Sequence, residues 1–304
     1  MKYDAVLIAG PTASGKSAAA LALAEHANGI VINADSMQVY REVRVLSARP
    51  SDEDMARARH LLYGHVSAHK RYSVGRYQTD AITALAKANA EKRVPIFVGG
   101  TGLYFAALTE GLADIPPVSA AIREAAREKL VALGVAGLHA ELAMRDPLTA
   151  TRLRPSDAQR VLRAYEVFEA TGRPLASWQD EAGKPVLEGR RLAKFVLDIE
   201  RAELRERIRL RFLAMIQAGA MEEAARLKAL DPTLPAAKIL GLRELSALAE
   251  GRMTKDDAIA AAVTATRQFA KRQVTWFRHR MSDWNWLSAG DESNFIAELR
   301  QQVT

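Results

Sequence analysis

The chain has 304 residues, 49% of them hydrophobic, and a formal net charge of +7. It is long for one compact domain, so we expect a main domain with an insertion or a small second domain. It contains no cysteine, which excludes disulfides, a thiol nucleophile and a cysteine zinc site and suits a reducing, cytoplasmic environment. The apolar run 5–9 is too short for a signal peptide. No later run reaches the roughly 18 apolar residues of a membrane span, so we expect no membrane association.

In the first third of the chain, short apolar runs alternate with segments of helical spacing. The predicted strands are 5–9, 30–33 and 95–98, and the predicted helices are 16–28, 76–91 and a segment from Leu103. Strands that alternate with helices form parallel sheets covered on both faces. The predicted fold class is therefore α/β, a P-loop NTPase-like parallel sheet flanked by helices.

The pattern changes near 114–117, where two prolines follow an acidic residue. From there to about residue 190 the sequence predicts only helices and loops, so we interpret residues 116–190 as a mostly helical insertion domain. Residues 1–115 and 191–304 then form the α/β core with its C-terminal helices. The elements predicted after the insertion are a strand at 195–199, helices at 201–229, 236–250 and 255–280, and a short strand at 284–287.

Residues 10–17 match the phosphate-binding pattern G-x-x-x-x-G-K-[ST] between a predicted strand and a predicted helix. Glycines let the backbone N–H groups approach a phosphate, and the following helix directs its positive end at the same anion. Lys16 adds a positive charge, and the Ser17 hydroxyl can ligate Mg²⁺. The predicted phosphate ligands are Gly10, Pro11, Thr12, Ala13, Ser14, Gly15, Lys16 and Ser17. The motif predicts a bound diphosphate or nucleotide with Mg²⁺ but does not specify the reaction.

Asp35 follows the second apolar run and would lie at the strand edge that faces the ligand crevice of an open α/β sheet. It could hold the metal through water or act as a general base, or it is a turn aspartate bonded to local backbone. Gln38 and Tyr40 would suit recognition of a base edge, or are loop residues without a partner. Thr101, at the third strand end, is a helix N-cap, a substrate contact, or both.

Two arginines of the predicted insertion lie three residues apart. Residues 156–159 predict a capping box that opens a helix, and Arg160 and Arg163 share a face of that helix. Two guanidinium groups on one face can clamp a diphosphate or an RNA phosphate. The alternative is a solvated face on which they pair with Glu166.

The last long predicted helix carries a basic stripe of Arg267, Lys271 and Arg278. At about 100° per residue these three lie within about 40° of one another. Phe269 and Trp276 lie on the opposite side and are predicted to face the core. Such a stripe is typical of a nucleic-acid surface; the alternative is an ordinary solvated face.

Three classes of protein fit these observations: a P-loop small-molecule or nucleotide kinase, a P-loop transferase that acts on nucleic acid, and a non-enzymatic ATP switch. The basic helices beyond residue 200 exceed what a small-molecule kinase needs. A pure binding module would not need both a metal-binding hydroxyl and a facing carboxylate. The transferase is therefore favoured, with the kinase as the alternative.

The ordered set of motifs resembles the tRNA dimethylallyltransferases, also called tRNA isopentenyltransferases, from about residue 5 to about residue 280. The segments that carry the resemblance are 10–17, 35–40, 98–104, 146–147 with Arg152, 157–167, 171–174 and 266–278. Eukaryotic members often add a C-terminal zinc finger, and this cysteine-free chain resembles the bacterial type. The segment 240–243, Leu-Gly-Leu-Arg, departs from a pattern in which tyrosine is common, so no role of that tyrosine carries over.

The resemblance implies transfer of a dimethylallyl group from dimethylallyl diphosphate to N6 of the adenosine 3′ of the anticodon, with release of diphosphate. Asp35 would be the general base, Thr101 would bond near the reacting amine, and Lys16 would neutralise the departing diphosphate with Mg²⁺ on Ser17. Arg160 and Arg163 would help to bind the diphosphate. The family positions that contact tRNA match Asp35, Ser36, Met37, Gln38, Thr101, Arg123, Gln159, Arg160, Val161, Leu162 and Arg163. We expect a monomer.

Overall fold

The computed structural model describes residues 2–181, 183–290 and 292–303. The chain forms two compact units, one of Met1–Leu108 with Val186–Thr304 and the other of Thr109–Pro185. Within the described ranges, no helix is long and apolar enough to cross a membrane. Each unit has a hydrophobic core of its own.

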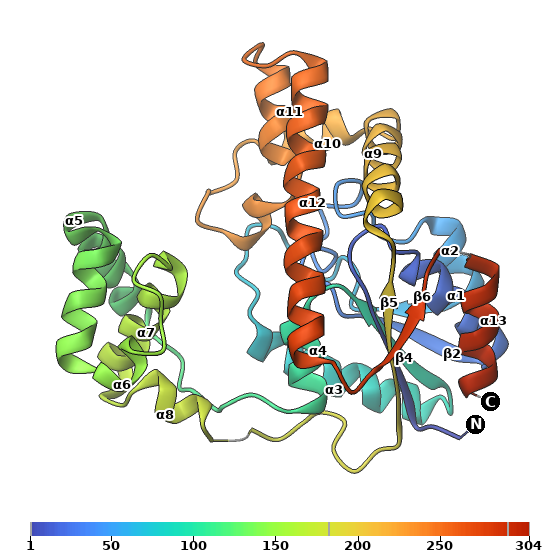
Figure 1. Ribbon diagram of the computed structural model, residues 1–304, viewed down its shortest axis with the longest axis horizontal. Helices are drawn as coiled ribbons and strands as arrows, with labels where there is room; N and C mark the ends of the chain where they lie inside the picture. Colours follow the sequence, from blue (N-terminus) through green and yellow to red (C-terminus); the bar gives the residue numbers. More distant parts are fainter. Residues whose placement is uncertain (1, 182, 291, 304) are drawn as a thin grey trace. The chain divides into compact units, whose positions relative to one another are not determined.

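The first unit is built on a six-stranded sheet in which every pair of neighbouring strands is parallel. The strand order is β3-β2-β4-β1-β5-β6. The strands are β1 (Ala5–Ala9), β2 (Gly29–Asn33), β3 (Arg59–Leu61), β4 (Val94–Gly99), β5 (Leu192–Asp198) and β6 (Asn285–Ser288). Helices cover both faces of the sheet (Figure 1), and the predicted α/β class is confirmed.

Alternate side chains of β1 enter two separate cores, because successive residues of a strand point to opposite faces. Val6 and Ile8 pack with the residues of α1 and α13, whereas Leu7 packs with those of α3, α4 and α12. All three side chains are fully buried. The sheet is therefore hydrophobic on both faces, as parallel sheets require. The helices named are α1 (Lys16–His26), α3 (Val74–Ala90), α4 (Gly102–Thr109), α12 (Lys255–Arg280) and α13 (Glu292–Val303).

Glycines divide two of the segments predicted as single helices. Gly219 has a φ of +97° and separates α9 from α10, and Gly241 has a φ of +87° and separates a 3-10 turn, η1, from α11. A left-handed φ ends an α-helix, so the expected helices 201–229 and 236–250 are each interrupted. The pieces are α9 (Arg201–Gln217), α10 (Ala220–Leu227), η1 (Pro235–Lys238) and α11 (Leu242–Ala249). The sequence interpretation also missed α2 (Asp52–Arg57), β3 and α13.

The second unit is helical, with α5 (Ala120–Arg145), α6 (Pro147–Ala150), α7 (Ala158–Thr171) and α8 (Leu175–Gln179). It begins and ends a few residues before the expected 116–190. At the C-terminal end, Val186 and Leu187 donate backbone hydrogen bonds to Ala107 and Leu108 and so already belong to the first unit. The predicted capping box at Ser156 is wrong, because the carboxylate of the next residue, Asp157, accepts the capping bond from the N–H of Arg160.

Candidate active site

The phosphate-binding sequence 10–17 forms the loop between β1 and α1. Ala13 and Gly15 have φ of +65° and +86°, and left-handed residues within such a loop create a concavity of backbone N–H groups that binds anions. Gly10 is needed because a Cβ there would lie 2.7 Å from the hydroxyl of Ser14 and 3.2 Å from Cβ of Leu197. The first turn of α1 follows directly, so its positive end faces the same concavity.

Two polar side chains of this loop are buried and can still donate hydrogen bonds to a bound anion. Lys16 is 9% exposed, and its Nζ donates a hydrogen bond to the carbonyl of Pro11 at 3.1 Å. The hydroxyl of Ser14 is fully buried and has no hydrogen-bond partner among the described residues. Buried polar groups are normally satisfied. A bound anion that accepts hydrogen bonds from both side chains would complete the loop.

Asp35 is held just past the end of β2 by its neighbours. The side chain of Asn33 accepts a bond from the N–H of Asp35 and donates to its carbonyl, each at 2.9 Å. Oδ1 of Asp35 accepts from the N–H of Met37 at 2.9 Å, as expected for a turn aspartate. Oδ2 lies on the side of Gly100, where an added Cβ would approach it to 3.4 Å. The local bond thus fixes the carboxylate and leaves its second oxygen directed at the neighbouring strand end.

Lys16 and Asp35 lie within electrostatic reach of each other. Burial lowers the pKa of Lys16 to about 8, the Asp35 carboxylate opposes this shift, and Arg211 of α9 adds to it. Burial lowers the pKa of Arg211, again opposed by Asp35. Two cations and one carboxylate therefore share a poorly solvated site, in which each charge is stronger than in water.

Arg211 was not identified from the sequence. It is one of five arginines in α9, with Arg201, Arg205, Arg207 and Arg209, and their spacing alone does not show which of them faces inward. Arg207, one turn earlier, also lies beside the loop, since a Cβ on Gly15 would come within 3.8 Å of its Nη1. The helix thus directs two guanidinium groups toward the phosphate loop.

Thr101 joins two strand ends. Its hydroxyl accepts a bond from the N–H of Ser36 at 2.9 Å and donates to the hydroxyl of Ser36 at 3.2 Å. Its N–H donates to the carbonyl of Ala34. The hydroxyl of Thr101 is thus bonded to the Asp35 turn. Among the described residues it makes no bond to the N-terminus of α4, which the predicted role of helix N-cap would require. Thr101 therefore lies beside Asp35, and its predicted contact with substrate stays a prediction.

Other predicted residues of this segment are buried instead of presented to a ligand. Gln38 is 9% exposed, and its Nε2 donates to the carbonyls of Ser47 and Ala48. Tyr40 is fully packed in the core, so its predicted role in recognising a base is wrong. Met37 is half-buried against the same core. The amide and the ring thus hold the loop in place.

In the second unit, the predicted RNA-binding residues divide between surface and core. Arg160 and Gln159 are exposed on α7, and the guanidinium of Arg160 lies 3.4 Å from Asp157. Val161 is fully buried in the helical core, with Leu162 packed beside it, because this face of α7 contacts α5. The side chain of Val161 therefore faces the helical core, and the predicted tRNA contact at this position stays a prediction.

Arg163 and Arg123 approach each other in this unit. Partial burial lowers the pKa of Arg163, although 45% of its side chain is exposed; Glu166 opposes the shift, and Arg123 adds to it. The Arg163–Glu166 pair has an N–O distance of 3.8 Å, so the pairing proposed as the alternative reading is present but long. Arg160 also borders a hollow of about 320 Å³ that is lined by Arg152, Leu153, Arg154 and Asp157.

The basic stripe of α12 is exposed as predicted at Arg267, Lys271 and Arg278. Nη2 of Arg278 lies 3.9 Å from Oδ2 of Asp198. On the inner side Trp276 packs against Gly102, where a Cβ would lie 2.2 Å from the indole. Phe269 does not reach either core and lies under the guanidinium of Arg272 at 5.8 Å, so the prediction for Phe269 is wrong. Phe277 takes the core position instead.

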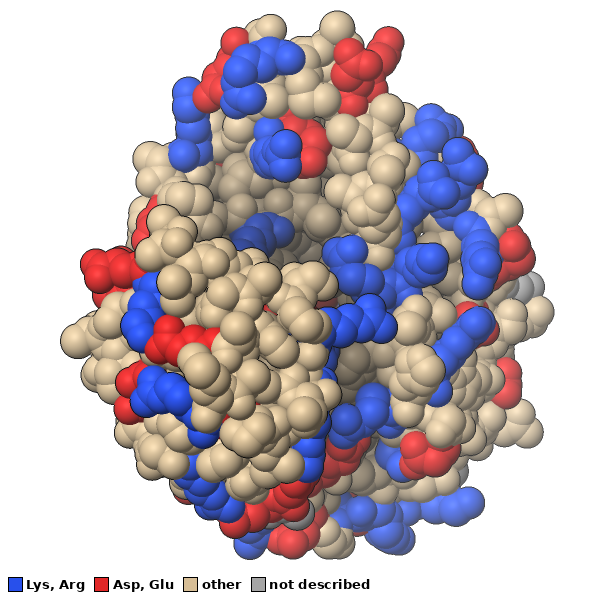
Figure 2. All heavy atoms as spheres, turned by 60° about the vertical axis from the view of Figure 1, so that its left-hand side comes forward, with Lys and Arg blue, Asp and Glu red and all other residues tan. Residues whose placement is uncertain are grey.

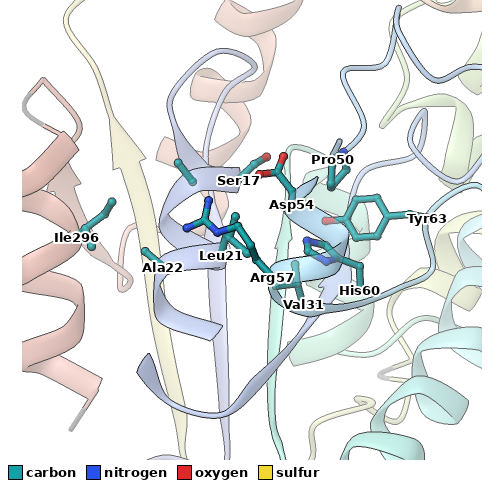
Figure 3. Close-up of a pocket in the computed structure, with 11 residues that line it drawn as sticks. Ser17, Leu21, Ala22, Val31, Pro50, Asp54, Arg57, His60, Tyr63 and Ile296 are labelled. Carbon is teal, nitrogen blue, oxygen red and sulfur yellow. The ribbon is translucent and has the colours of Figure 1, made fainter. Parts of the chain in front are cut away.

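A cavity of about 290 Å³ lies beside the exposed hydroxyl of Ser17 (Figure 3). Its polar lining includes Asp54, His60 and Tyr63, and its apolar lining comes mainly from α1 and β2. Burial raises the pKa of Tyr63, and the Asp35 carboxylate adds to this shift. Tyr63, which lies between the cavity and the Asp35 turn, therefore keeps its proton. The side of the loop that carries Ser17 is therefore open to small molecules.

Comparison with known proteins identifies the family. The model of the IPP transferase family matches residues 38–280. The tRNA dimethylallyltransferase of Azorhizobium caulinodans is 54% identical over 288 residues, which cover 93% of this chain and 92% of the relative. That of Methylobacterium nodulans is 53% identical over 291 residues, which cover 95% of this chain and 96% of the relative. This chain belongs to the IPP transferase family.

Solved structures of IPP transferases have the same fold. The crystal structure of the tRNA isopentenylpyrophosphate transferase of Bacillus halodurans is 30% identical, with a TM-score of 0.69 over 99% of this chain and 95% of that one. A eukaryotic dimethylallyltransferase, described as acting on tRNA, is 27% identical, with a TM-score of 0.80 over 98% of this chain and 77% of that one. The fold of this chain is thus a known architecture.

The phosphate loop offers one protein oxygen, the hydroxyl of Ser17, to a magnesium ion that would share a bound phosphate. Among the described residues there is no group of three His, Cys, Asp or Glu side chains able to hold a metal. Mg²⁺ commonly keeps several waters and binds through one or two protein oxygens plus substrate phosphates. The exposed hydroxyl of Ser17 at the start of α1 offers one such oxygen.

Proposed function

We propose that this IPP transferase transfers a dimethylallyl group from dimethylallyl diphosphate to N6 of the adenosine immediately 3′ of the anticodon in tRNA, releasing diphosphate. The observation that carries the proposal is that the Lys16 ammonium and the Asp35 carboxylate lie within electrostatic reach of each other. The chain that holds them is about half identical to proteins named tRNA dimethylallyltransferase. A cationic loop suits a diphosphate leaving group, and a carboxylate beside it suits a base. We further propose that the protein acts as a monomer in the cytoplasm.

The donor side of the reaction is the loop 10–17. Its N–H groups, the free hydroxyl of Ser14, Lys16 and Arg211 would bind the diphosphate and stabilise the charge that develops on the leaving oxygen. Phosphoryl transfer is not required, because the carbon–oxygen bond of the donor breaks and the diphosphate leaves intact. Magnesium held on Ser17 would supply further charge neutralisation to the same diphosphate.

The acceptor side is the Asp35 turn. The N6 amine of adenine is a poor nucleophile, because its lone pair is delocalised into the ring. Asp35 would take the proton from N6 as the new carbon–nitrogen bond forms, and the hydroxyl of Thr101 would orient the amine. The base must leave the stack of the anticodon loop before it can approach this turn.

The RNA would bind to exposed basic side chains. Those of α12 are Arg267, Lys271 and Arg278, and those of the second unit include Arg160 and Arg163. Lys and Arg side chains (blue) gather in groups on the face drawn in Figure 2. Because the polyanion is long and the cations are exposed, we expect binding that depends strongly on salt.

Two parallel incubations separate this function from that of a kinase. The purified protein is mixed with labelled dimethylallyl diphosphate, Mg²⁺ and bulk tRNA, and in parallel with labelled ATP and small acceptors. The proposal predicts label in the tRNA in the first reaction and none in the acceptors in the second. Phosphorylated acceptors without labelled tRNA would support the kinase instead.

Donor binding should weaken at alkaline pH. The pKa of Lys16 is lowered to about 8 in the free protein, and a bound diphosphate raises it again by favouring the ammonium. Below pH 8 the ammonium is already present, whereas above it binding must first take up a proton, so affinity falls by up to about tenfold per pH unit. Titration calorimetry with inorganic diphosphate from pH 7 to 9.5 measures this. The Lys16→Arg variant should lose this dependence, because arginine does not titrate in this range.

RNA affinity should fall steeply with salt and depend on the stripe of α12. Replacing Lys271 with alanine should weaken binding of an anticodon stem-loop and reduce the slope of log K against log salt by about 0.7 to 0.9. The matched control is Lys87→Ala, because Lys87 is an exposed lysine of α3. Equal slopes for both variants would remove the stripe from the RNA surface.

A further inference from the structure

Gln273 is a buried amide on the inner side of α12. Its side chain is 6% exposed, although the helix around it carries many charged residues. Its Oε1 accepts a hydrogen bond from the N–H of Thr12 at 3.0 Å, and its Nε2 donates to the carbonyl of Gly100 at 2.8 Å. One side chain therefore links the phosphate loop to the turn after β4, two segments that are far apart in the sequence.

The two partners fix the orientation of this amide. Thr12 offers a backbone donor and Gly100 a backbone acceptor, so the reversed amide would bring two donors together at one end and two acceptors at the other. An aliphatic side chain of the same size would leave both backbone groups without these bonds, which is costly away from water. Only a side chain with an acceptor and a donor on one planar group satisfies both.

Glycines bring the turn after β4 close to α12. A Cβ on Gly100 would lie 2.2 Å from Nε2 of Gln273 and 3.4 Å from Oδ2 of Asp35. A Cβ on Gly102 would lie 2.2 Å from the indole of Trp276, one turn further along α12. The helix thus holds the turn at two points, and the first of them adjoins the carboxylate of Asp35.

We propose that Gln273 is a positioning residue that fixes the phosphate loop relative to the Asp35–Thr101 turn. This inference rests on the proposed function, in which the loop holds the donor and the turn holds the base. Thr101 is bonded to Ser36, next to Asp35, so displacement of the 99–102 turn moves the base as well. Loss of the amide therefore weakens diphosphate binding and lowers the rate of transfer, while the basic surface for RNA is unchanged.

The test uses Gln273→Met, which keeps the length of the side chain and removes both bonds, with Gln268→Met as the control at an exposed position of the same helix. Inorganic diphosphate affinity is measured by calorimetry, RNA affinity with an anticodon stem-loop, and kcat with dimethylallyl diphosphate. We expect about tenfold weaker diphosphate binding and at least tenfold lower kcat. RNA affinity should stay within about twofold of the wild type, and Gln268→Met should leave all three values unchanged.

A double-mutant cycle adds a test that a general loss of stability would not pass. Gly100→Ala should weaken diphosphate binding in the wild type, because its Cβ displaces the amide. The same substitution should reduce diphosphate affinity much less in a Gln273→Ala background, where that space is free. Wild-type diphosphate affinity and kcat in folded Gln273→Met, equal losses for RNA and diphosphate, or additive effects in the cycle would each overturn the proposal. If the wild type transfers nothing to RNA, the proposed function fails, and the diphosphate titrations still decide the role of Gln273.

Discussion

Replacing Asp35 with alanine should lower kcat for dimethylallyl transfer by about 100- to 10,000-fold, the usual contribution of a general base. The carboxylate is held beside the phosphate loop by the bond between Oδ1 and the N–H of Met37, and it opposes the burial-induced shift in the pKa of Lys16. Without it, the proton of the attacking amine has no acceptor at this position. RNA and diphosphate should still bind, because neither needs a base. Single-turnover rates and the two dissociation constants are the measurements.

Asp35→Asn is the matched variant for this experiment. Its amide oxygen can still accept from Met37, so the turn keeps its bond, but the amide does not take up a proton. We expect turnover as low as that of Asp35→Ala, with a melting temperature closer to the wild type. Turnover near the wild-type rate in Asp35→Asn would show that Asp35 has only the local turn role.

Replacing Lys16 with alanine should weaken diphosphate binding by about 10- to 100-fold, the effect of removing a hydrogen bond to a charged group. The expected effect on RNA affinity is small. Because burial lowers the pKa of Lys16, the folded state disfavours the charged lysine, and its removal should not lower the melting temperature appreciably. Calorimetry with inorganic diphosphate and with a stem-loop RNA gives both affinities.

Lys87→Ala is again the surface control, and it should bind diphosphate as the wild type does. A Lys16→Ala protein that binds diphosphate normally but has lost RNA affinity would reverse the assignment of the loop. In that case the 10–17 segment would contact RNA, and the donor would have to bind elsewhere.

The parallel sheet and the phosphate loop could be predicted because each depends on local pattern. Buried strands of a parallel sheet are continuous apolar runs, and β1 (Ala5–Ala9) has the predicted limits. The loop 10–17 has fixed glycines for geometric reasons, and the helix 255–280 matches α12 at both ends. By contrast, the segment 52–61, with α2 and β3, has no run long enough to show its structure in advance.

Much of the site depends on tertiary packing that spacing does not reveal. Arg211 differs from the other arginines of α9 because burial lowers its pKa and the Asp35 carboxylate opposes this shift. Tyr40 and Gln38 look like exposed loop residues in the sequence, yet the fold buries both. Gln273 is hydrogen-bonded to Thr12 and Gly100, which lie 261 and 173 positions away in the sequence. Such contacts are fixed when distant elements meet, so sequence periodicity carries no signal for them.

The most direct test of the proposed chemistry is mass analysis of nucleosides from a synthetic anticodon stem-loop treated with the protein, dimethylallyl diphosphate and Mg²⁺. We predict one added dimethylallyl group on the adenosine 3′ of the anticodon, with one diphosphate released per group, and no addition when that base is a purine without the N6 amine. Modification of the N6-less RNA, or diphosphate release without any modified adenosine, would contradict the account.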